Sequence, residues 1–217
     1  SRLNIINGGG NYSGEYAIKL NDPIGSLTAE GNNYANGNAL MSSLAYSQRG
    51  FGIIAEMHRV DHMEFRSERA QEKQYIINYI PTLTKQHTYT LLALYPCATQ
   101  SEGEFGTQVD VFYKIKKGSV LGGKYGTKIS FNFSNIRSLE KGVKYDTNKN
   151  EIEEISSSFK NDYTDFTPKF FSKNGELFFN DINLEIYKKI NKKMKATGIL
   201  ARQSYNKDVL EGKTPGT

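Results

Sequence analysis

Apolar and polar residues alternate along most of this chain with a period of two, and several runs keep that alternation for nine or more residues. Successive side chains of a strand point to opposite faces, so each run predicts a strand with one apolar and one polar surface. The clearest run places on one face Phe105, Thr107, Val109, Val111, Tyr113 and Ile115. Two further runs have the apolar sets Tyr125, Thr127, Ile129, Phe131, Phe133 and Tyr12, Tyr16, Ile18, Leu20. The pattern predicts an all-β protein.

The lengths of these runs favour membrane strands over the strands of a soluble domain. We predict ten strands, at residues 12–20, 25–30, 38–47, 51–65, 74–80, 85–95, 104–115, 119–134, 175–187 and 193–205. Strands of globular domains usually have about five or six residues, whereas a tilted transmembrane strand needs about 9–11. Short turns such as 21–23, 48–50 and 116–118 alternate with longer connections, which is the asymmetry expected of the two rims of an outer-membrane barrel. The predicted fold is therefore an antiparallel transmembrane β-barrel, or a curved open section of one, with long amphipathic strands.

Composition is compatible with this fold. The chain has 217 residues, of which 37% are hydrophobic and 12% aromatic, and a mean hydropathy of −0.58. A barrel can be this polar because only alternate residues face lipid. No run of 18 apolar residues occurs, which excludes a transmembrane helix. We expect one β-barrel region over 1–217, with residues 135–174, rich in Lys, Asp, Asn and Ser, as a long extracellular loop.

The charge and the chain ends refine this picture. The net charge is +5, but the lysines are spread along the sequence or grouped in apparent turns, so no nucleic-acid surface is predicted. Cys97 is the single cysteine, which excludes an internal disulfide. Residues 1–4 lack the apolar core of an export signal, and 211–217 have the composition of a loop. We therefore expect the chain to be a fragment of a longer protein.

Three short motifs resemble metal or phosphate sites or contain runs of glycine. His58 and His62 would share a face of a helix, but in a strand they lie about 13 Å apart, too far to hold one metal ion. Residues 122–127 contain Gly-Gly-Lys but lack the spacing of a phosphate-binding loop and lead into a strand. Those glycines are better explained by a bend or by the close approach of a neighbouring backbone. Residues 8–10 are interpreted as a flexible turn.

No catalytic constellation is visible in the sequence. The Gly-x-Ser-x-Gly elbow that carries a serine nucleophile is missing, and no sequence pattern brings a Ser, a His and an acid together. The carboxylates are interpreted as residues facing the barrel interior, namely Glu56, Asp110, Asp181 and Glu185. We predict no catalytic residue, no cofactor and no metal, and therefore that the protein is not an enzyme.

Four segments carry a resemblance to a known family. These are Tyr79–Gln100, Leu121–Ser134, His62–Ser67 and Glu176–Ile186. They resemble a Bacteroidota outer-membrane β-barrel family of unknown function, and the likeness extends over roughly residues 38–205. It implies the outer membrane of a Gram-negative bacterium and a longer parent chain. Cys97 stands where the family pattern has an aromatic residue. Because that family has no assigned activity, the resemblance assigns no functional residues.

The sequence therefore favours an integral outer-membrane barrel with a transport, scaffold or export-accessory role. Its expected partners are outer-membrane lipid, the barrel-assembly machinery and an unidentified outer-membrane or periplasmic protein. The main alternative is a soluble or surface-exposed β-sandwich or β-sheet module that binds a glycan or a protein. A third hypothesis is a barrel enzyme with its site among the rim loops.

Overall fold

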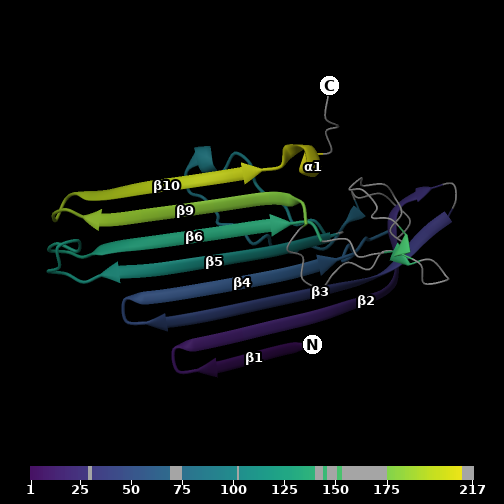
Figure 1. The fold of residues 1–217 in the computed structure, drawn as a ribbon, viewed down its shortest axis with the longest axis horizontal. Coiled ribbons are helices and arrows are strands. Elements are labelled where there is room, and N and C mark those ends of the chain that lie inside the picture. Colours follow the sequence, from purple (N-terminus) through teal and green to yellow (C-terminus); the bar gives the residue numbers. More distant parts are fainter. Residues whose placement is uncertain are drawn as a thin grey trace.

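Eight long strands form a single antiparallel sheet in the computed structural model of the chain (Figure 1). The structure describes residues 1–28, 31–68, 75–101, 103–139, 144–145, 151–152 and 175–211. The strands of this sheet are β1 (Arg2–Asn7), β2 (Gly10–Thr28), β3 (Gly31–Gln48), β4 (Phe51–Asp61), β5 (Gly103–Ile115), β6 (Thr127–Arg137), β9 (Leu177–Lys189) and β10 (Lys195–Tyr205). The remaining elements are the pair β7 (Lys144–Tyr145) and β8 (Glu151–Ile152), the 3-10 helix η2 (Thr90–Leu92) and the helix α1 (Lys207–Glu211).

The sheet is a meander with two free edges. Each strand pairs with the strand that follows it in the sheet order β1-β2-β3-β4-β5-β6-β9-β10, and β7 and β8 pair only with each other. The first strand, β1, and the last, β10, lie at opposite edges of the described sheet (Figure 1). The predicted all-β fold is confirmed in the form of one open antiparallel sheet with almost no helix. Among the described residues, no helix has the length and apolar character needed to cross a membrane.

The register of the strands separates the sheet into one apolar and one polar face. Partners directly opposite each other in a ladder point to the same side. Val109 pairs with Phe133, and Val111 with Phe131, so these four residues share what we call the apolar face. The alternate positions form what we call the polar face, where Gln108–Ser134, Asp110–Asn132 and Lys114–Lys128 are polar pairs, and Ile136 and Phe112 are the apolar members. The predicted alternation in these two strands is confirmed.

Two predicted strands, 74–80 and 85–95, are wrong. Residue 74 lies outside the described part, and the described residues 75–101 contain η2 and no strand beyond an isolated bridge between Arg66 and Ile76. The alternation in 85–95 does not make a strand because β4 and β5 already pair directly with each other. That pairing leaves no free edge between β4 and β5 for the residues that connect them. They cross the polar face of the sheet instead.

Other strand boundaries also differ from the predictions. The predicted turn at residues 21–23 is a bulge inside β2, where Asn21 has a φ of +46°. The predicted loop at 31–37 belongs to β3, and β4 ends at Asp61 instead of residue 65, because His62 adopts a φ of +48°. Strand β1 was not predicted. Most of the predicted loop 135–174 lies outside the described residues, although β6 continues into it as far as Arg137.

The predicted hairpin between residues 104 and 134 is confirmed, with a longer turn than the sequence indicated. Strands β5 and β6 pair along their whole length, but β6 begins at Thr127, so the turn spans 116–126 instead of 116–118. Three glycines in this turn have positive φ, at +81° for Gly118, +57° for Gly123 and +83° for Gly126. The turn is wide because its chain repeatedly adopts the left-handed conformation that glycine accommodates without strain.

We predict that Gly126→Ala destabilises the protein by about 1–3 kcal/mol. The residue has a φ of +83°, and an added Cβ would lie 2.9 Å from the carbonyl oxygen of Ile115. The matched control is Val120→Ala in the same turn, because the Val120 side chain is 99% exposed and its removal costs no packing. The free energy of unfolding from denaturant titration measures both changes. Equal effects of the two substitutions would contradict the structural role of Gly126.

Candidate functional site

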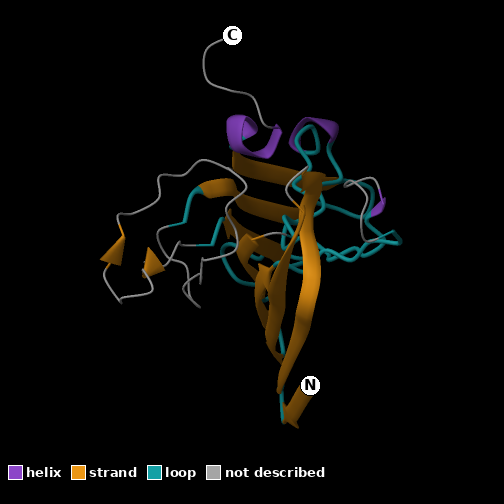
Figure 2. Cartoon of the chain, turned by 90° about the vertical axis from the view of Figure 1, so that its right-hand side faces the viewer, coloured by secondary structure: helices purple, strands orange, loops and turns teal. Residues whose placement is uncertain are grey.

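The connection between β4 and β5 lies across the polar face of the sheet. We call residues 62–102 the crossing segment; residues 69–74 and 102 of it are outside the described part. Figure 2 shows its teal loops on one side of the strands. The polar residues beneath it are among the most buried of the chain, including Glu104, Asn132, Ser134 and Asp181, each 0% exposed. A buried polar group needs a hydrogen-bonding partner, and several contacts to the crossing segment provide one.

The first contact centres on His58 and Glu104, which project from the neighbouring strands β4 and β5. His58 Nε2 lies 2.6 Å from Glu104 Oε1, and the backbone N–H of Gln100 donates to Glu104 Oε2 over 2.6 Å. Gly106 leaves the space that the imidazole ring occupies, because a Cβ there would lie 2.7 Å from His58 Nε2. The carboxylate of Glu104 therefore joins a sheet residue to the end of the crossing segment.

The second contact joins the middle of the crossing segment to β9 and β10. His87 Nε2 lies 2.5 Å from Asp181 Oδ2, and Lys85 Nζ donates to Asn183 Oδ1 over 2.7 Å. Gln203 of β10 donates from Nε2 to the carbonyl oxygen of Leu92 over 2.9 Å. Because these partners are more than 90 residues apart in sequence, they fix the segment on the far half of the sheet.

The third contact holds the start of the crossing segment beside β2. Lys19 Nζ donates to the carbonyl oxygen of Glu64 over 2.8 Å and forms an ion pair with Asp22 at 3.1 Å. Asn78 bonds to the backbone of Phe65 and of Met63, at 2.9 and 2.8 Å. A small apolar cluster of Ala39, Val60 and Met63 lies beside these bonds. A larger one, around Ile136, Phe178 and Phe179, holds Cys97 at the other end.

Cys97 is chemically inert in this setting. Burial raises the pKa of its thiol to about 12, and the nearby carboxylate of Glu104 acts in the same direction, while a hydrogen bond with Thr82 opposes them. The thiolate is the form that attacks electrophiles and binds metals. At neutral pH the side chain is therefore a neutral member of the apolar cluster and not a nucleophile.

The apolar face has the opposite character, because its large side chains are open to the surroundings. Exposed residues on this face come from strands across the whole sheet: Ile5, Leu44, Tyr46, Tyr113, Ile182, Ile186 and Leu200. The cross-strand ladders place them in three neighbouring rows, which we call the apolar belt. Among the described strands, the extensive contacts are all between hydrogen-bonded neighbours, so no second sheet packs on the belt. Burial in this sheet is thus inverted where the crossing segment lies, with the polar face covered there and the apolar belt bare, whereas Ile54 and Phe112 of the polar face are exposed beyond it.

The residues considered as metal or phosphate ligands serve structural purposes. His58 bonds to Glu104, whereas His62 Nδ1 lies 2.7 Å from Asp61 Oδ1. Within the described ranges, no group of three or more His, Cys, Asp or Glu side chains is arranged to hold a metal ion. Gly122 allows a close backbone approach, since a Cβ there would collide with the carbonyl oxygen of Lys116. Residues 8 and 9 form the β1–β2 turn.

The four carboxylates singled out from the sequence do share one face. The ladders connect Glu56 through Gln108 and Ser134 to Asp181, and place Asp110 in the next row and Glu185 beyond it. Asp110 accepts hydrogen bonds from Asn132 Nδ2 and Gln108 Nε2, both at 2.9 Å. Asp110 is therefore held by neighbouring amides, whereas Asp181 and Glu185 are held by His87 and Lys85 of the crossing segment.

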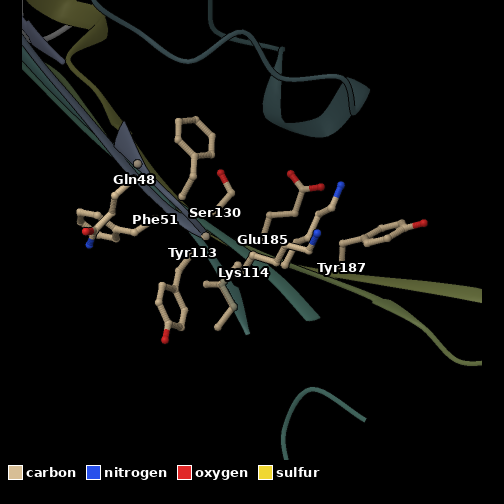
Figure 3. Close-up of a pocket in the computed structure, with 12 residues that line it drawn as sticks. Gln48, Phe51, Tyr113, Lys114, Ser130, Glu185 and Tyr187 are labelled. Atoms are coloured by element: carbon tan, nitrogen blue, oxygen red, sulfur yellow. The ribbon is translucent and has the colours of Figure 1, made fainter. Parts of the chain in front are cut away.

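An open pocket of about 650 Å³ lies beyond the edge of the crossing segment. Its lining comes from both faces of the sheet: Figure 3 shows Ser130 and Glu185 on one side of the strands and Tyr113 on the other. It is therefore a depression that wraps around the strand ends. Two lysines in it, Lys114 and Lys128, are direct cross-strand partners. The pocket has the character of a charged rim and not of an enclosed reaction chamber.

Sequence reasoning missed the residues that hold the crossing segment. His87 and Lys85 fall within a stretch whose alternation predicted a strand, and no local pattern links them to Asp181 or Asn183. The available signal was the polar set of residues in β9, which needed partners once that face was buried.

The comparisons with known proteins give a family and no activity. The model of the family of unknown function DUF6029 matches residues 1–216, so the chain belongs to that family. No curated protein and no solved structure matches the chain.

We predict that Gly106→Ala costs about 1–3 kcal/mol in the free energy of unfolding, because its Cβ would overlap the buried His58 ring. Gly198→Ala is the matched control, since it lies within β10 and an added Cβ meets nothing within 4 Å. Denaturant titration compares the two variants. If Gly198→Ala proved as costly as Gly106→Ala, the tight fit around His58 would not be the cause.

We also predict that Cys97 resists thiol reagents in the folded protein. Between pH 7 and 9 its labelling stays slow, because a thiol whose pKa is about 12 remains protonated in that window. In denaturant the same residue has an ordinary pKa near 8.5, so its labelling accelerates as the pH rises. The rate of reaction with a maleimide measures both states. Rapid labelling of the folded protein at pH 7 would refute the inert assignment.

Proposed function

We propose that this chain forms part of the wall of an outer-membrane β-barrel in a Gram-negative bacterium. In this proposal the apolar belt faces lipid, the polar face lines the interior, and the crossing segment occupies that interior. The observation that carries the proposal is the inverted burial of the sheet. In water an apolar surface of this extent would be driven to bury itself, whereas in a bilayer it is the correct outer surface.

The dimensions of the strands support the same proposal. Strands β4, β5, β6, β9 and β10 have 11–13 residues each, which is enough to cross the hydrocarbon layer at a tilt. Polar rows bound the apolar belt, with Asn135 and Asn180 paired on one side and Lys188 on the other. The resemblance of residues 38–205 to Bacteroidota outer-membrane barrels agrees with this assignment. Closure of the barrel would require the edges β1 and β10 to find partners, because an unpaired edge is costly in lipid.

The crossing segment inside the proposed barrel reduces the number of transport roles that the protein could have. A crossing segment joined to β2, β5, β9 and β10 by buried hydrogen bonds obstructs the path that an open diffusion pore would need. The proposal is therefore a plugged barrel with a scaffold, export-accessory or gated transport role, without enzymatic activity. Such a protein would be inserted into the outer membrane by the barrel-assembly machinery and could bind an outer-membrane or periplasmic protein. A soluble sheet module instead needs another layer of protein over the apolar belt.

The deciding experiment compares two adjacent residues of the interior strand β3. Leu44 is 52% exposed on the apolar face, and Ala45 points to the polar face. In lipid vesicles, Leu44→Arg is expected to cost about 2–4 kcal/mol if it lies near the bilayer midplane, and Ala45→Arg much less. The free energy of unfolding in vesicles is the measurement.

The soluble alternative gives a different result in the same experiment. For a module that stays in water without detergent, Leu44→Arg replaces an already exposed side chain and costs less than about 0.5 kcal/mol. A detergent-independent monomer with equal costs at the two positions would overturn the barrel proposal. A requirement for detergent, heat-modifiable gel mobility and a selective cost at Leu44 would support it.

A further inference from the structure

One end of the sheet gathers a third of the cationic side chains of the chain. Residues 111–130 and 186–201 contain no Asp or Glu and ten lysines: Lys114, Lys116, Lys117, Lys124, Lys128, Lys188, Lys189, Lys192, Lys193 and Lys195. We call these ten residues the lysine rim. They contribute +10 to a net charge of +5, so the rest of the chain carries −5. The net charge of the whole chain therefore does not show that one part of it is strongly positive and the rest negative.

The fold brings the two parts of the lysine rim together. Thr127, the first residue of β6, pairs with Lys188 near the end of β9, so the turns 116–126 and 190–194 project from the same end of the sheet (Figure 1). The ammonium groups of Lys124 and Lys189 lie 6.0 and 5.1 Å from the ring centroid of the same residue, Tyr125. The lysines that are spread along the sequence therefore gather at one end of the sheet.

Glu185 lines the same pocket as Lys114 and Lys128, but its ion pair is with Lys85, at 3.9 Å. Two lysine pairs are direct cross-strand partners, Lys114 with Lys128 and Lys189 with Lys195. Like charges in such positions repel each other. Within the described part of the chain, no carboxylate forms an ion pair with any lysine of the rim. An anionic partner from outside would relieve this repulsion.

Apolar side chains in the same turns indicate what kind of anion fits. Val120 and Leu121 in one turn, and Ile190 and Met194 in the other, are each more than half exposed. The lysine rim is also continuous with the apolar belt, because Lys188 follows Ile186 on the same face, about 7 Å further along β9. A soluble polyanion offers nothing to exposed Val, Leu and Ile side chains, whereas a lipid surface offers phosphates and acyl chains together.

We propose that the lysine rim binds the phosphate groups of anionic phospholipids at the membrane surface and sets the depth of the sheet in the bilayer. This inference rests on the proposed barrel, since it places the apolar belt in the adjoining hydrocarbon. The turn lysines contact headgroup phosphates, and the exposed apolar residues between them enter the acyl boundary. Tyr113, exposed in the outermost row of the belt, lies at the level where aromatic residues collect in membrane proteins.

The test measures lipid selectivity of the full chain released from membranes in detergent. Native mass spectrometry counts bound lipids after incubation with an equimolar mixture of phosphatidylglycerol and phosphatidylcholine. The rim variant carries Lys→Gln at four positions: Lys116, Lys117, Lys192 and Lys193. The matched control carries the same four changes in the β6–β9 connection, at Lys141, Lys144, Lys149 and Lys160. Far-ultraviolet circular dichroism compares the β content of all three proteins.

We expect the unmodified chain and the control to take up phosphatidylglycerol in preference by at least about tenfold, and the rim variant to lose most of that preference. Raised salt should weaken the preference of the unmodified chain, a readout that remains if the rim variant fails to fold. Equal uptake of the two lipids by the unmodified chain, or an unchanged preference in the rim variant, would overturn the inference. So would displacement of phosphatidylglycerol by an oligonucleotide or polyglutamate at lower concentration, which would assign the rim to a soluble polyanion.

Failure of this inference is distinguishable from failure of the barrel proposal. A selective cost at Leu44 without lipid preference leaves the barrel intact and removes only the role of the lysine rim. Lipid preference without a cost at Leu44 leaves a peripheral membrane protein that uses the same lysines.

Discussion

The structure depends on the burial of a polar sheet face, which requires that most of its buried donors and acceptors find a partner. Asp181 and Glu104 are fully buried carboxylates, and each is held by a histidine, His87 and His58 respectively. Removing one member of such a buried pair commonly costs about 3–5 kcal/mol, because the charge or dipole that remains cannot reach water. The crossing segment is therefore a structural requirement of the sheet and not an optional loop, and its position over β9 and β10 follows from where the acceptors are.

Strand alternation predicts the sheet well where two strands that follow each other in the sequence also pair with each other in the sheet. The β5–β6 hairpin and the faces of Val109 and Asp110 follow from period two alone. Alternation wrongly predicts a strand at residues 85–95. A strand also needs a neighbouring strand to pair with, and the facing edges of β4 and β5 are paired with each other. Alternation also fails at Asn21, where a bulge absorbs what the sequence indicates as a turn. The contact of His87 with Asp181 is non-local and has no signature in either segment.

The candidate site shows the same division between local and non-local information. That Glu56, Asp110, Asp181 and Glu185 share one face is a consequence of alternation within strands that pair in register. What covers that face could not be predicted, since it depends on where the crossing segment turns after His62. The inertness of Cys97 is likewise non-local, because the burial that raises its thiol pKa comes from Ile136, Phe178 and Phe179 on distant strands.

Charge and hydrophobicity both change in order along the strands of the sheet. Along β9 the residues pass from the buried Phe178 and Asp181, through the exposed Ile182 and Ile186, to Lys188 at the end of the strand. Water on all sides of a protein favours no particular order of residues along a strand. A bilayer does, because its hydrocarbon layer is bounded by anionic headgroups within a few residues of strand length. The order along single strands and the inverted burial across the sheet are both what the proposed bilayer surroundings would produce.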